Sequence, residues 1–331
     1  MSEYKGIKGF QVQTRDGDPS EGIVGDFFYN STTGQFKTIG AGVGSWASGG
    51  SFPGPYYLSG SSGGTTTAGW TAAGALSGSY IDESYEYNGA TWGSAVTMNR
   101  NTGGYAGGCG PQAAGIVVSG YQNAPSAGDT TDCETYNGSS WTTIESLPAA
   151  RKENTTGGTA TAAIAAGGAV PSATAEYFTW NGSSWTDSGN INTARSNANA
   201  GNGISTSMLV ISGTDPVTTV TESWNGSSWT EITEVNTGRY RAQAAGVSNS
   251  DTLFYSGSLT PGTAQAKTEQ WDGTSWTEVG DLAQARKWPG GNGTTSAAWA
   301  MGGDTGPGSS ELATTEIWDL PEFAIKSVTT S

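Results

Sequence analysis

Short runs of small and apolar residues, each ending in glycine, recur along the chain and set its expected fold. Six runs of this kind end at Gly74, Gly120, Gly168, Gly213, Gly257 and Gly303. A short apolar run bounded by turn residues is typical of a buried β-strand. The chain shows no convincing 3.6-residue periodicity of an amphipathic helix. The pattern therefore predicts an all-β protein built from repeats.

A second pattern follows most of these runs: an aromatic residue, Asn or Asp, Gly, a small residue, Ser or Thr, and Trp. It reads YNGATW (87–92), YNGSSW (136–141), WNGSSW (180–185 and 224–229) and WDGTSW (271–276). Asn-Gly or Asp-Gly between two aromatic residues is a strong hairpin signal, because both turn residues tolerate positive φ. The closing tryptophans lie about 44 to 49 residues apart. Such a spacing is the repeat length of a four-stranded propeller blade.

The last repeat lacks its closing tryptophan. Trp318 takes the place of the first aromatic, and DLPEF follows it instead of the turn. Trp46 lies in register ahead of Trp92, so we expect the segment around Trp46 to complete the sheet built from residues 284–319. A ring joined in this way leaves no open sheet edge. The sequence thus predicts a six-bladed β-propeller of four-stranded antiparallel blades, closed by an N-terminal strand; an open sandwich would not explain six equal periods.

Three segments follow from this interpretation: an N-terminal arm (1–40), the propeller (41–320) and a C-terminal tail (321–331). Six tryptophans recur with the period, and we expect them to be buried between adjacent blades: Trp46, Trp92, Trp141, Trp185, Trp229 and Trp276. The arm has one hairpin signal, FFYNSTTGQFKTI (27–39). An isolated hairpin is marginally stable in water. Its apolar residues should therefore contact either a partner protein or the propeller itself: Phe27, Phe28, Tyr29 and Phe36.

Composition narrows the possible partners. The formal net charge is −15, which disfavours binding to the phosphates of nucleic acids. No apolar run is long enough to cross a membrane, and the first residues have no apolar segment typical of a signal peptide. We therefore expect no nucleic-acid partner and no membrane insertion. Cys109 and Cys133 are the only cysteines, and they either pair or remain free.

The sequence contains no histidine. This absence removes the commonest general base and metal ligand, and with them the Ser-His-Asp and Cys-His arrangements. A sialidase Asp box is not matched either, because the turn carries an aromatic such as Trp224 where the box needs Asp. Asp129, Asp132 and Glu134 form a tight acidic cluster, which we interpret as a solvated loop and not as a glycosidase pair. We expect no catalytic residue, no metal site and no cofactor.

Charged residues also recur with the period. Five arginines follow the blade tryptophans: Arg100, Arg151, Arg195, Arg239 and Arg286, with Tyr56 at the equivalent position of the remaining repeat. Glutamates precede the first aromatic of each turn: Glu83, Glu134, Glu176, Glu222, Glu269 and Glu316. One interpretation is an Arg–Glu pair repeated between strands or blades. The other is a ring of arginines at one channel mouth that binds an anion. Recurrence with the core period favours the first.

Two resemblances add to these inferences. Over residues 46–319, the double-glycine strand end, the Glu-x-aromatic and the later tryptophan resemble the kelch family, although the Asn-Gly turns and the small first strand depart from it. The segment GDFFYNSTTGQFKTIGAGVGSW (25–46) resembles segments in structural proteins of tailed bacteriophages, which implies a virion component.

Two functions remain open, and neither is enzymatic. In the first, the chain is a phage virion protein assembled in the host cytoplasm, in multiple copies per particle. The propeller is then a rigid display or adhesion head, as in a tail fibre or surface decoration. The arm binds other virion proteins, and the head binds a host glycan or receptor. In the second, the chain is a soluble lectin-like propeller that binds carbohydrate through exposed aromatic residues such as Tyr56, Tyr57 and Tyr121.

Overall fold

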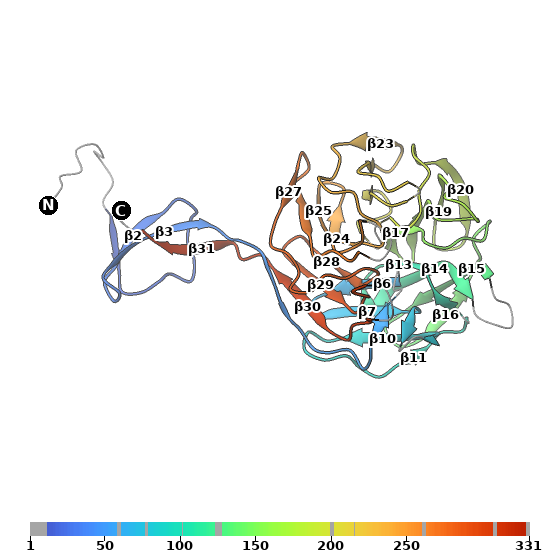
Figure 1. The fold of residues 1–331 in the computed structure, drawn as a ribbon, viewed down its shortest axis with the longest axis horizontal. Helices are drawn as coiled ribbons and strands as arrows, with labels where there is room; N and C mark the ends of the chain where they lie inside the picture. Colours follow the sequence, from blue (N-terminus) through green and yellow to red (C-terminus); the bar gives the residue numbers. More distant parts are fainter. Residues whose placement is uncertain are drawn as a thin grey trace. The chain divides into compact units, whose positions relative to one another are not determined.

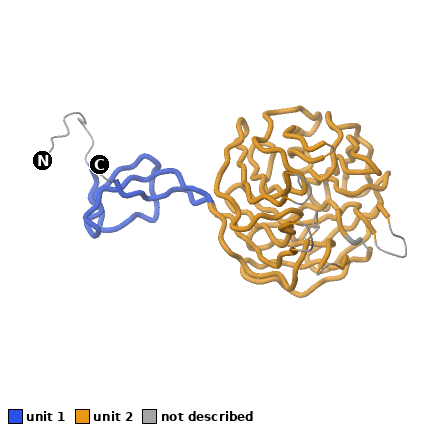
Figure 2. Tube along the Cα trace, viewed as in Figure 1, with its two compact units in different colours: residues 1–44, 320–331 blue, residues 45–319 orange. Residues whose placement is uncertain are grey.

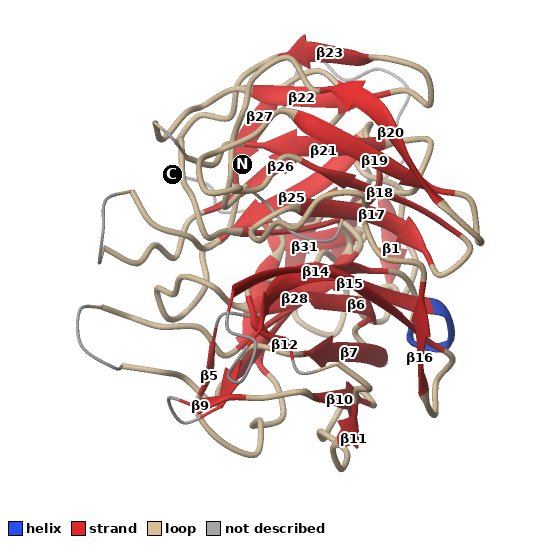
Figure 3. Cartoon of the chain, turned by 90° about the vertical axis from the view of Figure 1, so that its right-hand side faces the viewer, coloured by secondary structure: helices blue, strands red, loops and turns tan. Residues whose placement is uncertain are grey.

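Strands and loops make up almost the whole described chain. The computed structural model describes residues 12–57, 61–76, 79–100, 102–122, 128–198, 202–214, 216–259, 263–306 and 310–328. Within these ranges the one helical element is a 3-10 turn, η1 (Gln112–Ala114), drawn in blue in Figure 3. No helix there is long and apolar enough to span a membrane. The prediction of an all-β fold is therefore confirmed.

The chain divides into two compact units (Figure 2). Unit 1 contains residues 1–44 and 320–331, and unit 2 contains residues 45–319. All the sequence repeats fall in unit 2, while both ends of the chain belong to unit 1.

Each sequence repeat contributes one antiparallel sheet to unit 2; among the described residues most of these sheets have four strands, the second repeat has five and the fourth has three. The first repeat forms β6 (Ser61–Thr65), β7 (Ala68–Ala72), β10 (Glu83–Tyr87) and β11 (Val96–Thr97). The second forms β12 (Thr102–Gly104), β13 (Gly107–Cys109), β14 (Gly115–Gln122), β15 (Gly128–Tyr136) and β16 (Trp141–Ile144). The third forms β17 (Thr155–Thr159), β18 (Ala162–Ala166), β19 (Glu176–Trp180) and β20 (Trp185–Asn190).

The later repeats follow the same order. The fourth forms β21 (Met208–Ile211), β22 (Thr221–Trp224) and β23 (Trp229–Ile232). The fifth forms β24 (Gln243–Ser248), β25 (Asp251–Tyr255), β26 (Thr268–Trp271) and β27 (Trp276–Glu278). The last forms β28 (Gly290–Gly293), β29 (Ala297–Met301) and β30 (Thr315–Asp319), and β4 (Ser45–Ser48) adds the fourth strand. A small separate sheet contains β5 (Tyr56–Tyr57), β8 (Ala75–Leu76) and β9 (Ser79–Tyr80). Figure 1 shows the sheets fanned about a common centre, which is consistent with a β-propeller.

The Asn-Gly and Asp-Gly motifs form the hairpin turns that the sequence predicts. In the fourth repeat, Trp224 and Trp229 are directly opposite each other across the turn. The Asn225 Oδ1 accepts hydrogen bonds from the backbone N–H groups of Ser227 (3.0 Å) and Ser228 (2.9 Å). Gly226 has a φ of 92°, which glycine adopts without steric penalty. The turn is therefore fixed by local chemistry, in agreement with its recurrence.

The first strands of neighbouring repeats contact one another near the centre, and their residues are small. Gly157 of β17 illustrates the reason. A Cβ at this position would lie 2.6 Å from the backbone oxygen of Asn202 in the next repeat, which is inside van der Waals contact. Glycine is required because the backbones approach so closely.

Unit 1 is a sheet made from both ends of the chain. Its strand order is β1 (Gln13–Arg15), β2 (Phe27–Asn30), β3 (Gln35–Ala41) and β31 (Phe323–Ser327). The predicted hairpin is β2–β3. The C-terminal segment, which the sequence pattern left as a tail, pairs along β3, with Ile325 opposite Ile39. The hairpin therefore has a partner strand from the same chain.

The recurring tryptophans lie where neighbouring sheets pack. Trp141, Trp185 and Trp276 are buried, whereas Trp46, Trp92 and Trp229 are half-buried. Several indole N–H groups reach the preceding repeat: Trp141 donates to Ser84 Oγ (2.8 Å), Trp92 to Thr315 Oγ1 (3.0 Å) and Trp46 to Thr268 Oγ1 (3.0 Å). These tryptophans thus contribute both packing area and an indole hydrogen bond to the contact between neighbouring sheets.

Candidate functional site

The recurring arginines are buried inside unit 2. Each donates to groups of its own or the next repeat: Arg151 to Glu176 (2.8 Å), Arg195 to Glu222 (2.5 Å), Arg239 to Glu269 (3.2 Å), Arg286 to Glu316, and Arg100 to the carbonyls of Ser119 and Asp132. Burial lowers the pKa of all five guanidinium groups, that of Arg239 to about 10. These groups face carboxylates and carbonyls, and they do not line an open mouth.

The paired glutamates tie one repeat to the next. Glu222 accepts from the backbone N–H groups of Asn192 (2.6 Å) and Thr193 (3.0 Å), which lie in the loop that leaves the preceding sheet. The same loop contains Arg195, so one carboxylate receives both backbone and side-chain donors. Buried charges are tolerated only when they are paired and hydrogen-bonded in this way. The repeated Arg–Glu contact is therefore part of the fold.

The acidic cluster lies on a strand and not in a solvated loop, contrary to our expectation. Asp129, Asp132 and Glu134 all belong to β15. Glu134 is buried and accepts from the backbone N–H of Asn99 (3.0 Å), and Asp129 pairs with Lys152 (3.4 Å). Asp132 accepts from the side chain of Gln122, so each carboxylate of the cluster has a separate partner. Within the described ranges, no group of three His, Cys, Asp or Glu side chains could hold a metal ion.

Tyr56 is fully buried, so it is not one of the exposed aromatic residues expected of a lectin surface. Its hydroxyl donates to the carbonyl of Ala73, as the arginines of other repeats donate to the equivalent strand end. Phe52 packs against its ring at 4.9 Å. Tyr56 thus replaces an arginine in the first repeat. Tyr57 and Tyr121 are half-buried.

In the arm, the four apolar residues separate onto two faces of the sheet. Phe27 and Phe36 are stacked, with ring centroids 5.5 Å apart, and both are exposed. Tyr29 packs against Phe36 at 5.1 Å on the same face. Phe28 is buried on the opposite face and is not available to a partner in this structure. Three of the four residues therefore form the exposed aromatic face of unit 1.

The centre of unit 2 carries a feature that the sequence reasoning missed. Five residues, one in each of five successive repeats, have left-handed backbone conformations: Tyr105 (φ 57°), Glu153 (φ 62°), Asn197 (φ 48°), Arg241 (φ 59°) and Trp288 (φ 53°). We call these five residues the mouth ring. Their backbones are joined head to tail, since each N–H donates to the carbonyl of its predecessor: Glu153 to Tyr105 (2.7 Å), Asn197 to Glu153 (3.2 Å), Arg241 to Asn197 (3.0 Å) and Trp288 to Arg241 (2.8 Å). The equivalent segment of the first repeat falls at residues 58–60, outside the described ranges.

The mouth ring has an aromatic side and a polar side. Trp288 lies near Tyr105 (6.2 Å between ring centroids) and Tyr57 (6.3 Å). Glu153 and Asn197 follow on the other side. Arg241 stands between the two sides, with its guanidinium carbon 3.7 Å from the centroid of the Trp288 ring. At this distance the electron-rich face of the Trp288 ring attracts the guanidinium cation.

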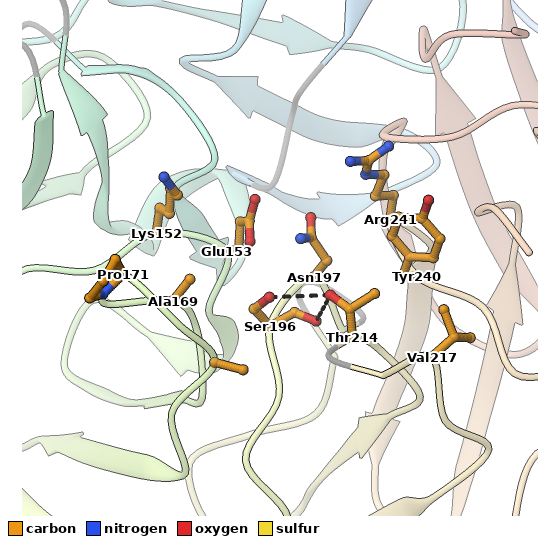
Figure 4. A pocket seen from close by; sticks show the side chains of 11 residues that line it. Lys152, Glu153, Ala169, Pro171, Ser196, Asn197, Thr214, Val217, Tyr240 and Arg241 are labelled. Carbon is orange, nitrogen blue, oxygen red and sulfur yellow. Dashed lines mark hydrogen bonds between the residues drawn. The ribbon is translucent and has the colours of Figure 1, made fainter. Parts of the chain in front are cut away.

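A pocket of about 440 Å³ opens on the polar side of the mouth ring (Figure 4). Figure 4 shows Glu153, Asn197 and Arg241 along one edge of it. Loops of the third and fourth repeats also line the pocket, through residues such as Pro171 and Val217. Volumes of this order accommodate small ligands.

The cationic side chains around the pocket differ in whether they have a carboxylate partner. Two lysines beside the mouth ring have carboxylate partners: Lys152 pairs with Asp129 and Lys287 with Asp304, both at 3.4 Å. Arg241 has no carboxylate partner among the described residues, and its Nε is buried without a hydrogen bond. Burial raises the pKa of the Glu153 carboxyl, although Asn197 and Ser196 act against this rise. Arg241 therefore has unused donors at the edge of the pocket.

A sequence signal for the mouth ring did exist. Glu153, Asn197, Arg241 and Trp288 each come two residues after a recurring arginine. These positions share a register and yet hold unlike residues, whereas the arginine two residues earlier repeats. A position that differs from repeat to repeat, at a fixed distance from a residue that recurs, is the pattern that would have located the mouth ring.

No protein-family model matches the sequence, and no curated protein matches it either. A solved structure titled "Structure of YjhT" matches it with a TM-score of 0.67 at 14% sequence identity. The match covers 83% of this chain and 99% of the other chain. At this low identity the likeness concerns the fold alone, and it agrees with a propeller-like arrangement. The kelch and phage resemblances gain no support from these comparisons.

Proposed function

We propose that the chain is a non-enzymatic adhesion protein of a phage virion, and that its mouth ring binds a host-surface carbohydrate. The carrying observation is that aromatic rings and polar groups adjoin within the mouth ring, with a pocket on its polar side. The apolar C–H face of a sugar packs on rings such as Trp288 and Tyr105. Its hydroxyl groups exchange hydrogen bonds with Arg241, Asn197 and Glu153.

We further propose that six blades form a closed ring and that unit 1 attaches it to the particle. Two observations support closure: the pairing of β4 with β30, and the inter-repeat bonds of the recurring tryptophans. The stacked Phe27 and Phe36 support an attachment surface, because large aromatic residues are enriched at protein interfaces. The virion assignment itself depends on the resemblance of residues 25–46. A soluble lectin-like propeller with the same carbohydrate site is the second candidate.

A glycan array tests the carbohydrate site. Wild-type protein should bind a defined subset of glycans, and Trp288→Ala and Arg241→Ala should each reduce that binding at least tenfold. Lys267→Ala is the matched control for loss of a cation, since Lys267 pairs with Glu278 (3.0 Å) and does not line the pocket. An array on which the wild-type protein binds nothing contradicts the carbohydrate assignment.

Fractionation separates the two candidates. A virion protein should co-purify with intact particles, and the double variant Phe27→Ser/Phe36→Ser should no longer do so. Val43→Ser removes another exposed apolar residue of unit 1 and serves as the control. Glycan binding without co-purification would favour the soluble lectin.

A further inference from the structure

The mouth ring is unusual in never using glycine. Glycine occupies most left-handed positions in the described part of the chain, from turns such as Gly226 to strand ends such as Gly168. At a second set of equivalent positions, the residues before the strand-end glycines, the repeats mix small side chains with glycine: Ala73, Ser119, Gly167, Ser212, Ser256 and Gly302. In the mouth ring, all five residues carry a larger side chain.

Such a choice is unfavourable for the backbone. A side chain with a Cβ in the left-handed region is strained, because the Cβ approaches the carbonyl oxygen; glycine avoids this and asparagine tolerates it best. Strain of this kind is typical of functional sites. The backbone hydrogen bonds that join the mouth ring use only N–H and C=O groups, so glycine could make them equally well.

The side chains themselves contribute little to the sheets. Glu153, Asn197 and Arg241 line the pocket and are half-buried. The carboxyl of Glu153 is partly desolvated, and Arg241 has no carboxylate partner among the described residues. Asn197 and Ser196 offset the desolvation of Glu153 only in part, and the buried Arg241 Nε has no hydrogen bond, so a bound molecule would add stabilising interactions here.

We infer that Glu153, Asn197 and Arg241, together with Tyr105 and Trp288, are specificity-determining residues whose side chains serve the ligand and not the fold. The identity of that ligand rests on the proposed function. The expected effect of these side chains on the melting temperature does not depend on it. Replacing these residues should change which ligand binds while the repeats remain folded.

The experiment compares glycine and alanine at the same positions in the full chain. Both substitutions remove the side chain, and only glycine removes the backbone strain. We expect Glu153→Gly and Arg241→Gly to melt about 1–3 °C above the corresponding alanine variants, with a smaller difference at Asn197. The triple glycine variant should melt at or above the wild-type temperature and should lose glycan-array binding. Ser256→Gly is the control: it relieves the same strain (φ 63°) at a buried side chain without a hydrogen bond, so it should keep binding.

Each outcome decides between the interpretations. A triple glycine variant that melts more than about 5 °C below wild type would show that these side chains hold the fold, and would overturn the inference. Unchanged glycan binding by that variant would overturn it as well. If the wild-type protein binds no glycan, the proposed function fails, while the order of melting temperatures still decides whether the fold needs these side chains.

Discussion

Trp46 lies directly opposite Trp318 in the antiparallel pair of β4 and β30, with ring centroids 5.6 Å apart. The two residues come from opposite ends of the repeat region. Trp46 also packs on Tyr255 of the neighbouring sheet (4.9 Å between ring centroids). One residue therefore joins the first segment of unit 2 both to its last strand and to the fifth repeat.

A first prediction concerns this strand. A shortened chain of residues 45–319 should fold and melt cooperatively, because it keeps β4. A chain of residues 50–319 should lose cooperative unfolding or aggregate, since β30 would then present an open edge. Thermal unfolding followed by tryptophan fluorescence compares the two chains. Equal melting temperatures would contradict a closing role for β4.

A second prediction distinguishes two recurring tryptophans. Trp141→Ala should destabilise the protein by about 3–5 kcal/mol, as removal of large buried aromatic residues does. Trp141 is buried, stacks on Tyr136 and donates to Ser84. Trp229→Ala should cost about 1 kcal/mol less, because Trp229 is half-buried and its indole N–H has no partner. Chemical denaturation measures both losses, and a larger loss for Trp229 would reverse our ranking.

The buried ion pairs give a third prediction. Arg239→Met leaves the buried carboxylate of Glu269 without its cation, which should cost about 3–5 kcal/mol. Lys267→Met, two residues before Glu269 in the chain, breaks the more exposed pair with Glu278 and should cost less than about 1 kcal/mol. Equilibrium unfolding in urea compares the variants. Similar losses would show that burial does not set the value of these pairs.

A fourth prediction concerns alkaline pH. Burial raises the pKa of Cys109 to about 12 and that of Cys133 to about 11, and it raises the pKa of Tyr255 well above its ordinary value. The folded protein therefore keeps these protons at a pH where the unfolded chain releases them. Stability should be complete below about pH 9 and should fall as the pH rises from 9 to 11. The lowered pKa of Arg239 acts in the opposite direction only near and above pH 10.

Melting temperatures from pH 8 to pH 10 test this dependence below the range of Arg239. Both thiols are free and buried, so the double variant Cys109→Ala/Cys133→Ala should lose less stability over that interval than wild type. Equal decreases in melting temperature for the two proteins would show that the thiols do not cause the loss of stability at alkaline pH.

Local chemistry explains which parts of the fold could be predicted. The Asn225–Gly226 turn is specified by two residues and recurs, so the sequence alone identifies it. The place of Trp46 could also be predicted, because a repeat period carries information over the whole chain. The pairing of β31 with β3 could not, since it occurs once and joins distant segments that have no shared pattern.

The site was harder to predict than the fold. The residue type does not indicate the left-handed backbone at Glu153 or Arg241, because neither residue favours that conformation. Tyr56 was misassigned to the surface although its register matched that of the buried arginines. A residue that takes the place of a buried arginine must itself be buried, and it must form a hydrogen bond to the same carbonyl.

Ser45 and Asp319 are paired at the boundary of unit 2, so unit 2 is an insertion between β3 and β31. Domains whose ends lie close together tolerate insertion and exchange. A recombination event with a single crossover inside unit 2 would separate β4 from β30 and leave both products with mismatched sheets. Exchange of the whole unit between related genes would require two crossovers, one near each member of this pair. Inheritance should therefore keep or replace the repeats as one block, while the residues of the mouth ring can diverge singly within it.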